Sequence, residues 1–260
     1  MFKFIRTRIE QGMQTIAFPG GERELPERYR GRPLLECSNC GTARCPQARE
    51  DSPTALIRDG ANGRAELDLG ACLFAPEEAV GSASCGVRFT GDYRMATTSA
   101  DALRTTTGEV QLAKALDERT KRLFGRSLRL RSVVAGSCNG CEGELVALGN
   151  VVFDLARFGV EFVASPRHAD GIVLTGIVNR NMRQPLEATY EAVPDPRLVI
   201  AVGACAASGG PFRDSPEVMG IPDSIPVDLW IPGCPPHPLT ILDGLLRLLG
   251  RMHERAASKD

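Results

Sequence analysis

Three short segments, each followed directly by a loop that contains cysteine, constrain the fold of this chain more than any other feature. Residues 128–134 alternate in character and are β-branched, while residues 197–202 and 227–231 are mainly apolar, so all three are typical of strands. A helical spacing of apolar residues follows the first loop and ends at Gly159. The loops together hold four cysteines: Cys138, Cys141, Cys205 and Cys234.

Further strands and helices alternate through the same half of the chain. The spacing predicts strands at residues 160–164 and 171–175, and helices at residues 145–158, 185–192 and 239–252. This alternation predicts an α/β fold, a doubly wound parallel sheet of the flavodoxin-like type. Ligands of such sheets bind outside the carboxyl ends of the strands, near the point where the strand order reverses. We therefore expect the four cysteines to converge on one site.

Four cysteines around one site have a restricted set of uses. Four thiolates suit a [4Fe–4S] cluster or a zinc ion. The first two cysteines precede a helix, where free backbone amides and the helix dipole favour the thiolate. The loop after residue 202 lacks the Gly-x-Gly-x2-Gly spacing and the acidic ribose ligand of a dinucleotide site, so we expect no nicotinamide or flavin site.

The cysteine loops carry three ordered motifs: Cys-x2-Cys-x2-Glu, Gly-x-Cys-Ala-x2-Gly-Gly and Pro-Gly-Cys-Pro-Pro. Over residues 126–250 they resemble the small subunit of nickel–iron hydrogenases and the related B subunit of complex I. The complex I branch typically has two adjacent cysteines in its first motif. The spacing here is similar to that of the hydrogenase branch, in particular its membrane-associated, formate-hydrogenlyase-like group. The resemblance implies that one [4Fe–4S] cluster, nearest the partner's active site, is ligated by Cys138, Cys141, Cys205 and Cys234.

The resemblance also implies a function and partners. The expected protein is an electron-transfer subunit of a multi-subunit oxidoreductase, which relays electrons to or from a [NiFe] hydrogenase-type large subunit, together with other iron–sulfur and membrane subunits. One alternative is a complex I-like, quinone-reducing role as the B subunit of an NADH:quinone oxidoreductase. Another is a zinc-stabilised scaffold without redox work. Iron–sulfur proteins are brown and zinc–thiolate proteins are colourless, so visible absorbance distinguishes the last alternative.

Composition narrows the class and the compartment. The chain has 260 residues, 43% hydrophobic and 24% charged, and a net charge of −1 without a long basic block, which argues against nucleic-acid binding. No apolar run approaches the ~18 residues of a membrane span, and no secretory or twin-arginine leader is visible. We expect a cytoplasmic protein, peripheral on the cytoplasmic side of the inner membrane through partner subunits. Nine cysteines in that compartment indicate metal or redox chemistry.

The amino-terminal part resembles a bacterial ferredoxin that has lost ligands. The run from Cys37 to Pro46 is similar to a ferredoxin cysteine run but lacks one cysteine and is two residues short. We expect a degenerate ferredoxin-like α+β domain at residues 1–96, a linker helix within 97–126, and the [4Fe–4S] domain at 127–252. The candidate ligands of a second site are Cys37, Cys40, Cys45, Cys72 and Cys85.

Five cysteines leave three alternatives for this domain. Two complete clusters would need eight thiolates and are excluded. One cluster can form from the first three cysteines together with Cys85 or Cys72. The same thiolates could hold zinc, or the domain could serve as a docking module without metal.

Several other residues are candidates for a role at the site or at an interface. Glu144 is a candidate proton relay beside the cluster, and the alternative is an acid in the first helical turn that stabilises the helix dipole. His237 could donate a hydrogen bond to a cluster sulfur or simply be exposed. Arg180 and Arg183 follow a strand end, either contacting a large partner subunit or lying in a solvated loop. Apolar residues between Phe2 and Met13 predict a short helix that packs on its own domain or anchors the chain to a partner or membrane surface.

Overall fold

The computed structural model describes residues 2–20, 25–36, 56–60, 65–75, 81–82, 85–106 and 108–252. Its carboxyl-terminal half is built on a single sheet. Five strands form this sheet: β7 (Leu128–Val134), β8 (Val160–Phe162), β9 (Gly171–Thr175), β10 (Leu198–Val202) and β11 (Leu229–Ile231).

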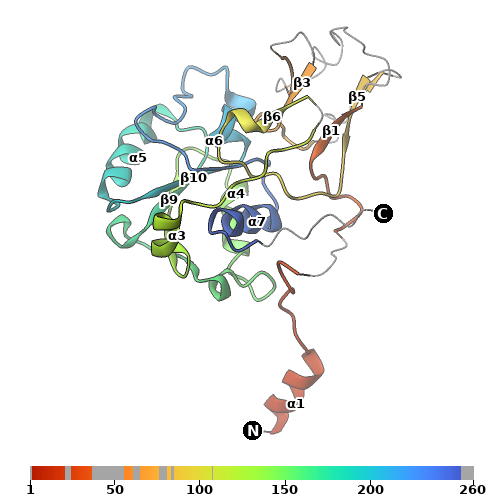
Figure 1. The fold of residues 1–260 in the computed structure, drawn as a ribbon, viewed down its shortest axis with the longest axis vertical. Helices are drawn as coiled ribbons and strands as arrows, with labels where there is room; N and C mark the ends of the chain where they lie inside the picture. Colours follow the sequence, from red (N-terminus) through yellow and green to blue (C-terminus); the bar gives the residue numbers. More distant parts are fainter. Residues whose placement is uncertain are drawn as a thin grey trace.

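The strand order of this sheet is β11-β10-β9-β7-β8, and every neighbouring pair is parallel. Numbered within the sheet, this is the order 2-1-3-4-5 of flavodoxin-like folds, whose reversal point lies between the first and third strands. That point here lies between β7 and β9. The predicted fold class is confirmed (Figure 1).

Helices cover both faces of the sheet, which explains the composition of its strands. All five residues of β9 and of β10 are buried, as expected for strands covered on both sides. On one face, Leu145 of α4 (Gly140–Ala147) and Leu242 of α7 (Pro238–Leu248) share a core with Leu130. On the other face, Leu186 of α5 (Arg180–Ala192) packs with Leu174.

The remaining helices are short. The α-helices are α1 (Phe2–Gln11), α3 (Glu118–Phe124) and α6 (Ala204–Ser208), and the 3-10 turns are η2 (Asp101–Leu103), η3 (Leu155–Phe158), η4 (Pro166–His168) and η5 (Gly210–Phe212). Within the described residues, none of the helices has the length and hydropathy that crossing a bilayer requires.

Two helix predictions in this half need correction. The helix expected at residues 145–158 ends at Ala147, because the Asn150 side chain accepts the backbone N–H groups of Val152 and Phe153 and so favours a turn. The helix expected at residues 185–192 begins earlier, at Arg180, because Asn179 caps it by accepting the Met182 amide.

The linker helix expected within residues 97–126 is mostly absent. Among the described residues of this range, α3 is the only α-helix and η2 is a single 3-10 turn, while residues 109–117 run without helical structure beside α7. Their amides bond to other parts of the chain, with Ala113 N–H donating to Ala96 (2.7 Å) and Leu116 N–H to Leu248 (2.9 Å). These long-range bonds replace the helix that the apolar spacing indicated.

The amino-terminal part contains two small antiparallel sheets. One has the order β1-β5-β4 and the other β2-β3-β6. The strands are β1 (Pro33–Glu36), β2 (Ile57–Asp59), β3 (Ala65–Asp68), β4 (Gly81–Ser82), β5 (Cys85–Phe89) and β6 (Arg104–Thr105). Trp230 of β11 packs against their shared core, and Thr97 pairs with Trp230 through two backbone hydrogen bonds of 2.9 and 2.8 Å. This pairing covers the edge of the large sheet. The ferredoxin-like assignment and the domain limits stay predictions.

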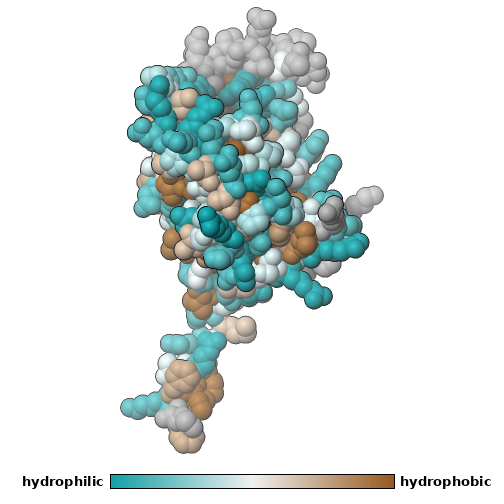
Figure 2. All heavy atoms as spheres, turned by 90° about the vertical axis from the view of Figure 1, so that its left-hand side faces the viewer, coloured by the Kyte–Doolittle hydropathy of each residue, from teal (hydrophilic) through white to brown (hydrophobic). Residues whose placement is uncertain are grey.

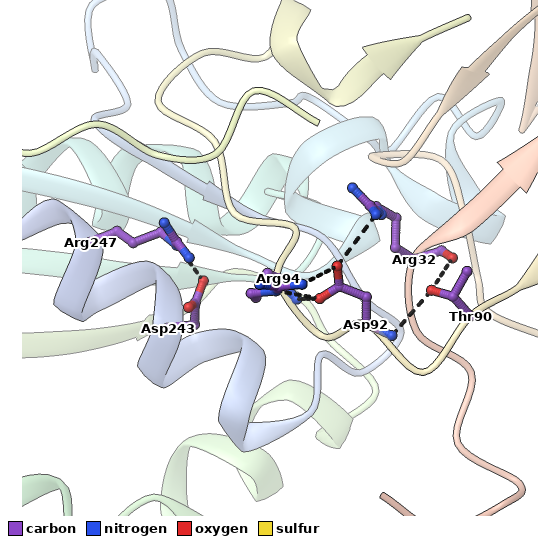
Figure 3. Close-up of polar contacts among 6 residues, drawn as sticks. All are labelled: Arg32, Thr90, Asp92, Arg94, Asp243 and Arg247. Carbon is purple, nitrogen blue, oxygen red and sulfur yellow. Dashed lines mark hydrogen bonds and ion pairs between the residues drawn. The ribbon is translucent and has the colours of Figure 1, made fainter. Parts of the chain in front are cut away.

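Two groups of charged side chains lie near each other, one in the amino-terminal part and one on α7 (Figure 3). Asp92 accepts two hydrogen bonds from the Arg94 guanidinium, at 2.8 and 3.0 Å, and a third from the Arg94 backbone N–H at 3.0 Å, and it pairs with Arg32 at 3.4 Å. Burial alone would raise the pKa of Asp92, but the bonds and charge of Arg94 and the charge of Arg32 outweigh it, so the pKa is lowered. Beside them, the fully buried Asp243 pairs with Arg247 at 2.8 Å, and burial raises its pKa despite that partner.

Candidate metal centre

The four cysteines of the carboxyl-terminal half lie in three loops at one edge of the sheet. Cys138 and Cys141 follow β7, Cys205 follows β10 and Cys234 follows β11. Parallel strands place all three loops at the carboxyl edge, and the reversal of strand order between β7 and β9 opens a crevice there. The three loops therefore lie at the same edge of the sheet, and the four-cysteine site stays a prediction.

Contacts between the loops show how closely they approach. A Cβ on Gly140 would lie 3.5 Å from Cys138 Sγ and 3.6 Å from carbons of Pro235, so the first and third loops touch. The second loop joins the third through backbone bonds, from Gly203 N–H to Ile231 (2.8 Å) and from Ala204 N–H to Gly233 (2.8 Å).

Gly203 is required where the second loop meets the first. A Cβ at this position would lie only 2.6 Å from Cys141 Sγ, and the backbone adopts φ +93°. Any other side chain would meet both the sulfur and the strain of a positive φ. The loop thus leaves room for the Cys141 thiol by omitting a side chain.

Burial and proximity set the electrostatics of the thiols. Cys141 is buried, at 8% exposure, whereas Cys138 is exposed. Burial raises the pKa of Cys141 to about 12, and the charges of Glu142 and of Cys205, Cys234 and Cys138 add to it. Burial likewise raises the pKa of Cys205 to about 11, with contributions from Cys234, Cys138 and Glu142. These mutual contributions show that the four sulfurs lie within electrostatic reach of one another.

These pKa values correct one expectation. The helix N-terminus is expected to favour thiolates, but burial and like charge dominate, so Cys141 and Cys205 without metal are thiols at neutral pH. Bound metal supplies the positive charge that thiolates need. The site is thus suited to a metal group rather than to a reactive cysteine.

Two kinds of metal group suit four thiolates. Zinc holds sulfur at about 2.3 Å, which brings four sulfurs to within about 4 Å of one another. Among the described residues, no three His, Cys, Asp or Glu side chains are close enough to hold one ion. A [4Fe–4S] cluster carries each thiolate on a separate iron. The donor set of four cysteines fits such a cluster, and zinc stays the alternative.

Glu142 braces the first loop, a role that sequence reasoning missed. Its carboxylate accepts a hydrogen bond from Ser137 Oγ (2.7 Å) and another from Thr175 Oγ1, at the end of β9. Thr175 is fully buried, so the pair ties the cysteine loop to the sheet. The signal in the sequence was an acidic residue in the first turn of α4.

Glu144 lies just beyond the first turn of α4, in which Glu142 is the acidic residue. It lines a cavity of about 260 Å³ together with Tyr29, Cys234, Pro236 and His237. Burial raises the pKa of Glu144. The structure thus places this carboxyl group beside the Cys234 loop, while the helix-dipole alternative describes Glu142 instead.

His237 caps α7 and is half-buried, so the expectation of a simply exposed side chain is wrong. Its Nδ1 accepts the Leu239 amide at 3.1 Å, and burial lowers its pKa. The rings of Tyr29 and Phe153 lie edge-on, with centroids 5.4 and 6.1 Å away. Because Nδ1 is an acceptor here, only Nε2 carries a proton to donate.

Comparison with known proteins assigns the family. The model of the family "NADH ubiquinone oxidoreductase, 20 Kd subunit" matches residues 138–248. The chain is 43% identical over 143 residues to the probable membrane-bound hydrogenase subunit mbhJ of Pyrococcus furiosus. The aligned residues make up 54% of this chain and 86% of that protein. The chain belongs to this 20 Kd subunit family. Both groups named in the predicted resemblance are therefore confirmed as relatives.

Two further relatives show the range of the family. Formate hydrogenlyase subunit 7 of Escherichia coli K12 is 46% identical over 131 residues, which are 50% of this chain and 51% of that protein. The B subunit of the NADH-quinone oxidoreductase of Citrifermentans bemidjiense is 48% identical over 108 residues, which are 42% of this chain and 64% of that protein. The chain thus spans only about half of the first relative and less than two thirds of the second.

Among solved structures, a chain of the membrane-bound sulfane sulfur reductase, an archaeal respiratory membrane complex, is 35% identical with a TM-score of 0.45. It covers 52% of this chain and 75% of that chain. A chain of an NAD+-reducing [NiFe]-hydrogenase is 24% identical with a TM-score of 0.36, and the match covers 51% of this chain and 97% of that chain.

The family match leaves the candidate second site untested. Cys37, Cys40 and Cys45 lie outside the described residues and outside the matched region, and Cys85 is described only as part of β5. Cys72 is fully buried in the amino-terminal core, where its sulfur accepts the Phe74 amide at 3.4 Å. The second site stays a prediction.

The two candidate interface arginines lie on a helix and not in a loop. Arg180 and Arg183 occupy the first turn of α5. Arg180 pairs with Glu217 at 3.6 Å and Arg183 with Glu187 at 3.4 Å, all at least a third exposed. Both arginines remain accessible for a partner, and the interface role stays a prediction.

Proposed function

We propose that this chain is an electron-transfer subunit of a multi-subunit oxidoreductase, with Cys138, Cys141, Cys205 and Cys234 holding one [4Fe–4S] cluster. The single observation that carries the proposal is the meeting of the three cysteine loops at the carboxyl edge of the sheet. When bound, the cluster would accept and release single electrons. The proposed partner is a [NiFe] hydrogenase-type large subunit, since relatives are named as hydrogenase and formate hydrogenlyase subunits.

The chain's own residues hold and insulate this site. Burial of Cys141 excludes water from the inner side, and the exposed Cys138 leaves the outer side open toward a partner. Glu142 holds the first loop on β9 through Thr175. Gly203 lets the second loop approach the Cys141 sulfur. These features keep the four sulfurs in position before any metal binds.

Glu144 is the proposed proton acceptor beside the cluster. It lines the same cavity as Cys234, and its raised pKa shows that burial disfavours its charge. A carboxyl group that gains a proton as an electron arrives nearby would limit the change in local charge. Glu144 would thus hold a proton at its carboxyl oxygen.

A specific observation favours a second candidate function, reduction of a quinone. The cavity beside Cys234 is lined by rings and polar groups, including Tyr29 and His237, which suits a flat polar headgroup. The relative from Citrifermentans bemidjiense is named as part of an NADH-quinone oxidoreductase. In this candidate function, the chain serves a complex I-like assembly.

The proposed location follows from the same relatives. Two of the relatives are named as membrane-bound or as part of formate hydrogenlyase. We place the chain on the cytoplasmic side of the inner membrane, held there by partner subunits.

The test is to isolate the complex that forms around the tagged chain in its own host. The proposal predicts a co-purifying large subunit that contains nickel, and hydrogen-dependent reduction of methyl viologen by the complex. A nickel-free complex that reduces a soluble quinone would establish the second candidate. A colourless chain that contains zinc and no iron would contradict both and favour the scaffold.

A further inference from the structure

The first helix, α1, is separated from the rest of the molecule. Figure 1 shows it projecting from the body, and none of its residues is buried. Its large apolar side chains are exposed to an unusual degree: Phe2 87%, Phe4 78%, Ile5 49% and Ile9 74%, followed by Met13 at 86%. Figure 2 shows apolar side chains gathered on this projection. Exposed apolar surface of this kind marks an interaction site.

The connection to the body is well defined. Thr15 Oγ1 donates to the Val151 carbonyl at 2.8 Å, and Ile16 N–H donates to Val152 at 2.9 Å. Phe18 is buried between Tyr93 and Phe158, with ring centroids 6.2 and 6.5 Å away. The chain is thus anchored from Thr15 onward, and α1 extends from that anchor on a short link that contains Gly12.

The side chains of α1 are segregated by face. At 3.6 residues per turn, Phe2, Ile5 and Ile9 fall on one side of the helix. Phe4 falls outside that face. The helix also carries three basic residues, Lys3, Arg6 and Arg8, and one acid, Glu10, which pairs with Arg6 at 2.7 Å.

The charge of α1 opposes that of the rest of the chain. Three basic residues and one acid give the helix +2, so the other residues total −3 to reach the net charge of −1. A basic helix with an apolar face is attracted to anionic lipid headgroups and inserts its apolar side chains among them. At about 1.5 Å per residue, its ten residues span only ~15 Å, too short to cross a bilayer core of ~30 Å.

We propose that α1 is a lipid-binding helix that lies in the surface of an anionic membrane and inserts Phe2, Ile5 and Ile9. This contact goes beyond attachment through partner subunits, because the chain itself touches lipid. A single short helix gives weak, reversible binding, so it adds to the attachment that a complex provides. The helix requires no metal centre for this role.

The test is flotation of the full chain with vesicles of phosphatidylcholine alone or mixed equally with phosphatidylglycerol. The chain should float with the anionic vesicles, bind the neutral ones more weakly, and detach as salt rises, because salt screens the headgroup charge. Ile9→Ala removes three carbons from the inserting face and should weaken partition about tenfold. Phe4→Ala is the control outside that face: it removes a larger apolar side chain, yet should weaken partition less than about threefold because Phe4 does not insert.

Two outcomes would overturn the proposal. One is the absence of binding to either vesicle, in which case a protein or a second copy of the chain covers the face. The other is equal weakening by Ile9→Ala and Phe4→Ala, because binding would then not depend on the face. Both variants should keep the wild-type iron content, so failure here is distinguishable from failure of the cluster assignment.

Discussion

At the scale of residues, the site depends on a glycine beside the sulfurs as well as on the cysteines themselves. Gly203 leaves the space that the Cys141 sulfur occupies, and its positive φ turns the chain from β10 into the second loop. Cys141 in turn lies in the first turn of α4, whose acid Glu142 is bonded to Thr175. A change at one of these positions therefore acts on the thiols without removing one.

Gly203→Ala tests this dependence. The added Cβ would lie 2.6 Å from Cys141 Sγ at φ +93°, which strains the fold by about 1–3 kcal/mol. We expect less than about half of the wild-type iron content and a lower Tm. Gly143→Ala in α4 is the control, because its Cβ meets nothing within 4 Å and alanine stabilises a helix interior by about 0.5–1 kcal/mol. A Gly203→Ala protein with wild-type iron and Tm would contradict the role of Gly203.

The sequence predicts the four central cysteines better than the residues around them. Short strands that end in Cys138, Cys205 and Cys234 loops must meet if the sheet is parallel, so local patterns suffice. The partners of Glu142 and His237 come from distant segments, such as Thr175 and Tyr29. Nothing in the local sequence indicates those contacts.

At the scale of elements, the strands could be predicted and the helix limits could not. The five strands of the large sheet are short, with apolar or alternating sequences, and all lie within a few residues of their predicted positions. The helix limits depend on side-chain hydrogen bonds, as at Asn150 and Asn179. Backbone amides within residues 109–117 donate to distant backbone carbonyls and not to helical ones. Apolar spacing alone carries no information about such competing bonds.

Asp92→Asn tests the group of charged side chains around Asp92 in the amino-terminal part. Asp92 is only 16% exposed and accepts two hydrogen bonds from the Arg94 guanidinium, so the variant should lose about 1–3 kcal/mol of stability at pH 7. The folded-state pKa of Asp92 is lowered, so its contribution is present above the unfolded pKa of about 3.9. It is lost as pH falls through the folded pKa.

The measurement is denaturant unfolding of wild type and Asp92→Asn at several pH values. The gap between them should be largest near pH 7 and narrow below about pH 4. Asp101→Asn is the control, because Asp101 is 94% exposed and should change stability by less than about 0.5 kcal/mol. A gap that does not vary with pH would show that the charge of Asp92 does not stabilise the fold.

At the scale of the whole molecule, a family domain is joined to an amino-terminal part that the family model does not match. The match begins at Cys138, which follows the two antiparallel sheets and β7 in the sequence. Thr97 and Trp230 join the two parts by covering the edge of the large sheet. Under the proposed function, a metal group on the amino-terminal cysteines would extend the electron path through this added part, and without one the part would serve as a docking module.

The most direct measurement is the iron and acid-labile sulfide content of anaerobically purified chain, with paramagnetic resonance after reduction, for wild type, Cys205→Ser and Cys72→Ala. The account predicts at least about four irons per wild-type chain, since one [4Fe–4S] cluster holds four. Cys205→Ser should lose about four of them, while Cys72→Ala keeps the carboxyl-terminal signal. About eight irons in the wild type would show a second cluster in the amino-terminal part. Full iron and sulfide in Cys205→Ser, or zinc without iron in the wild type, would contradict the proposed cluster.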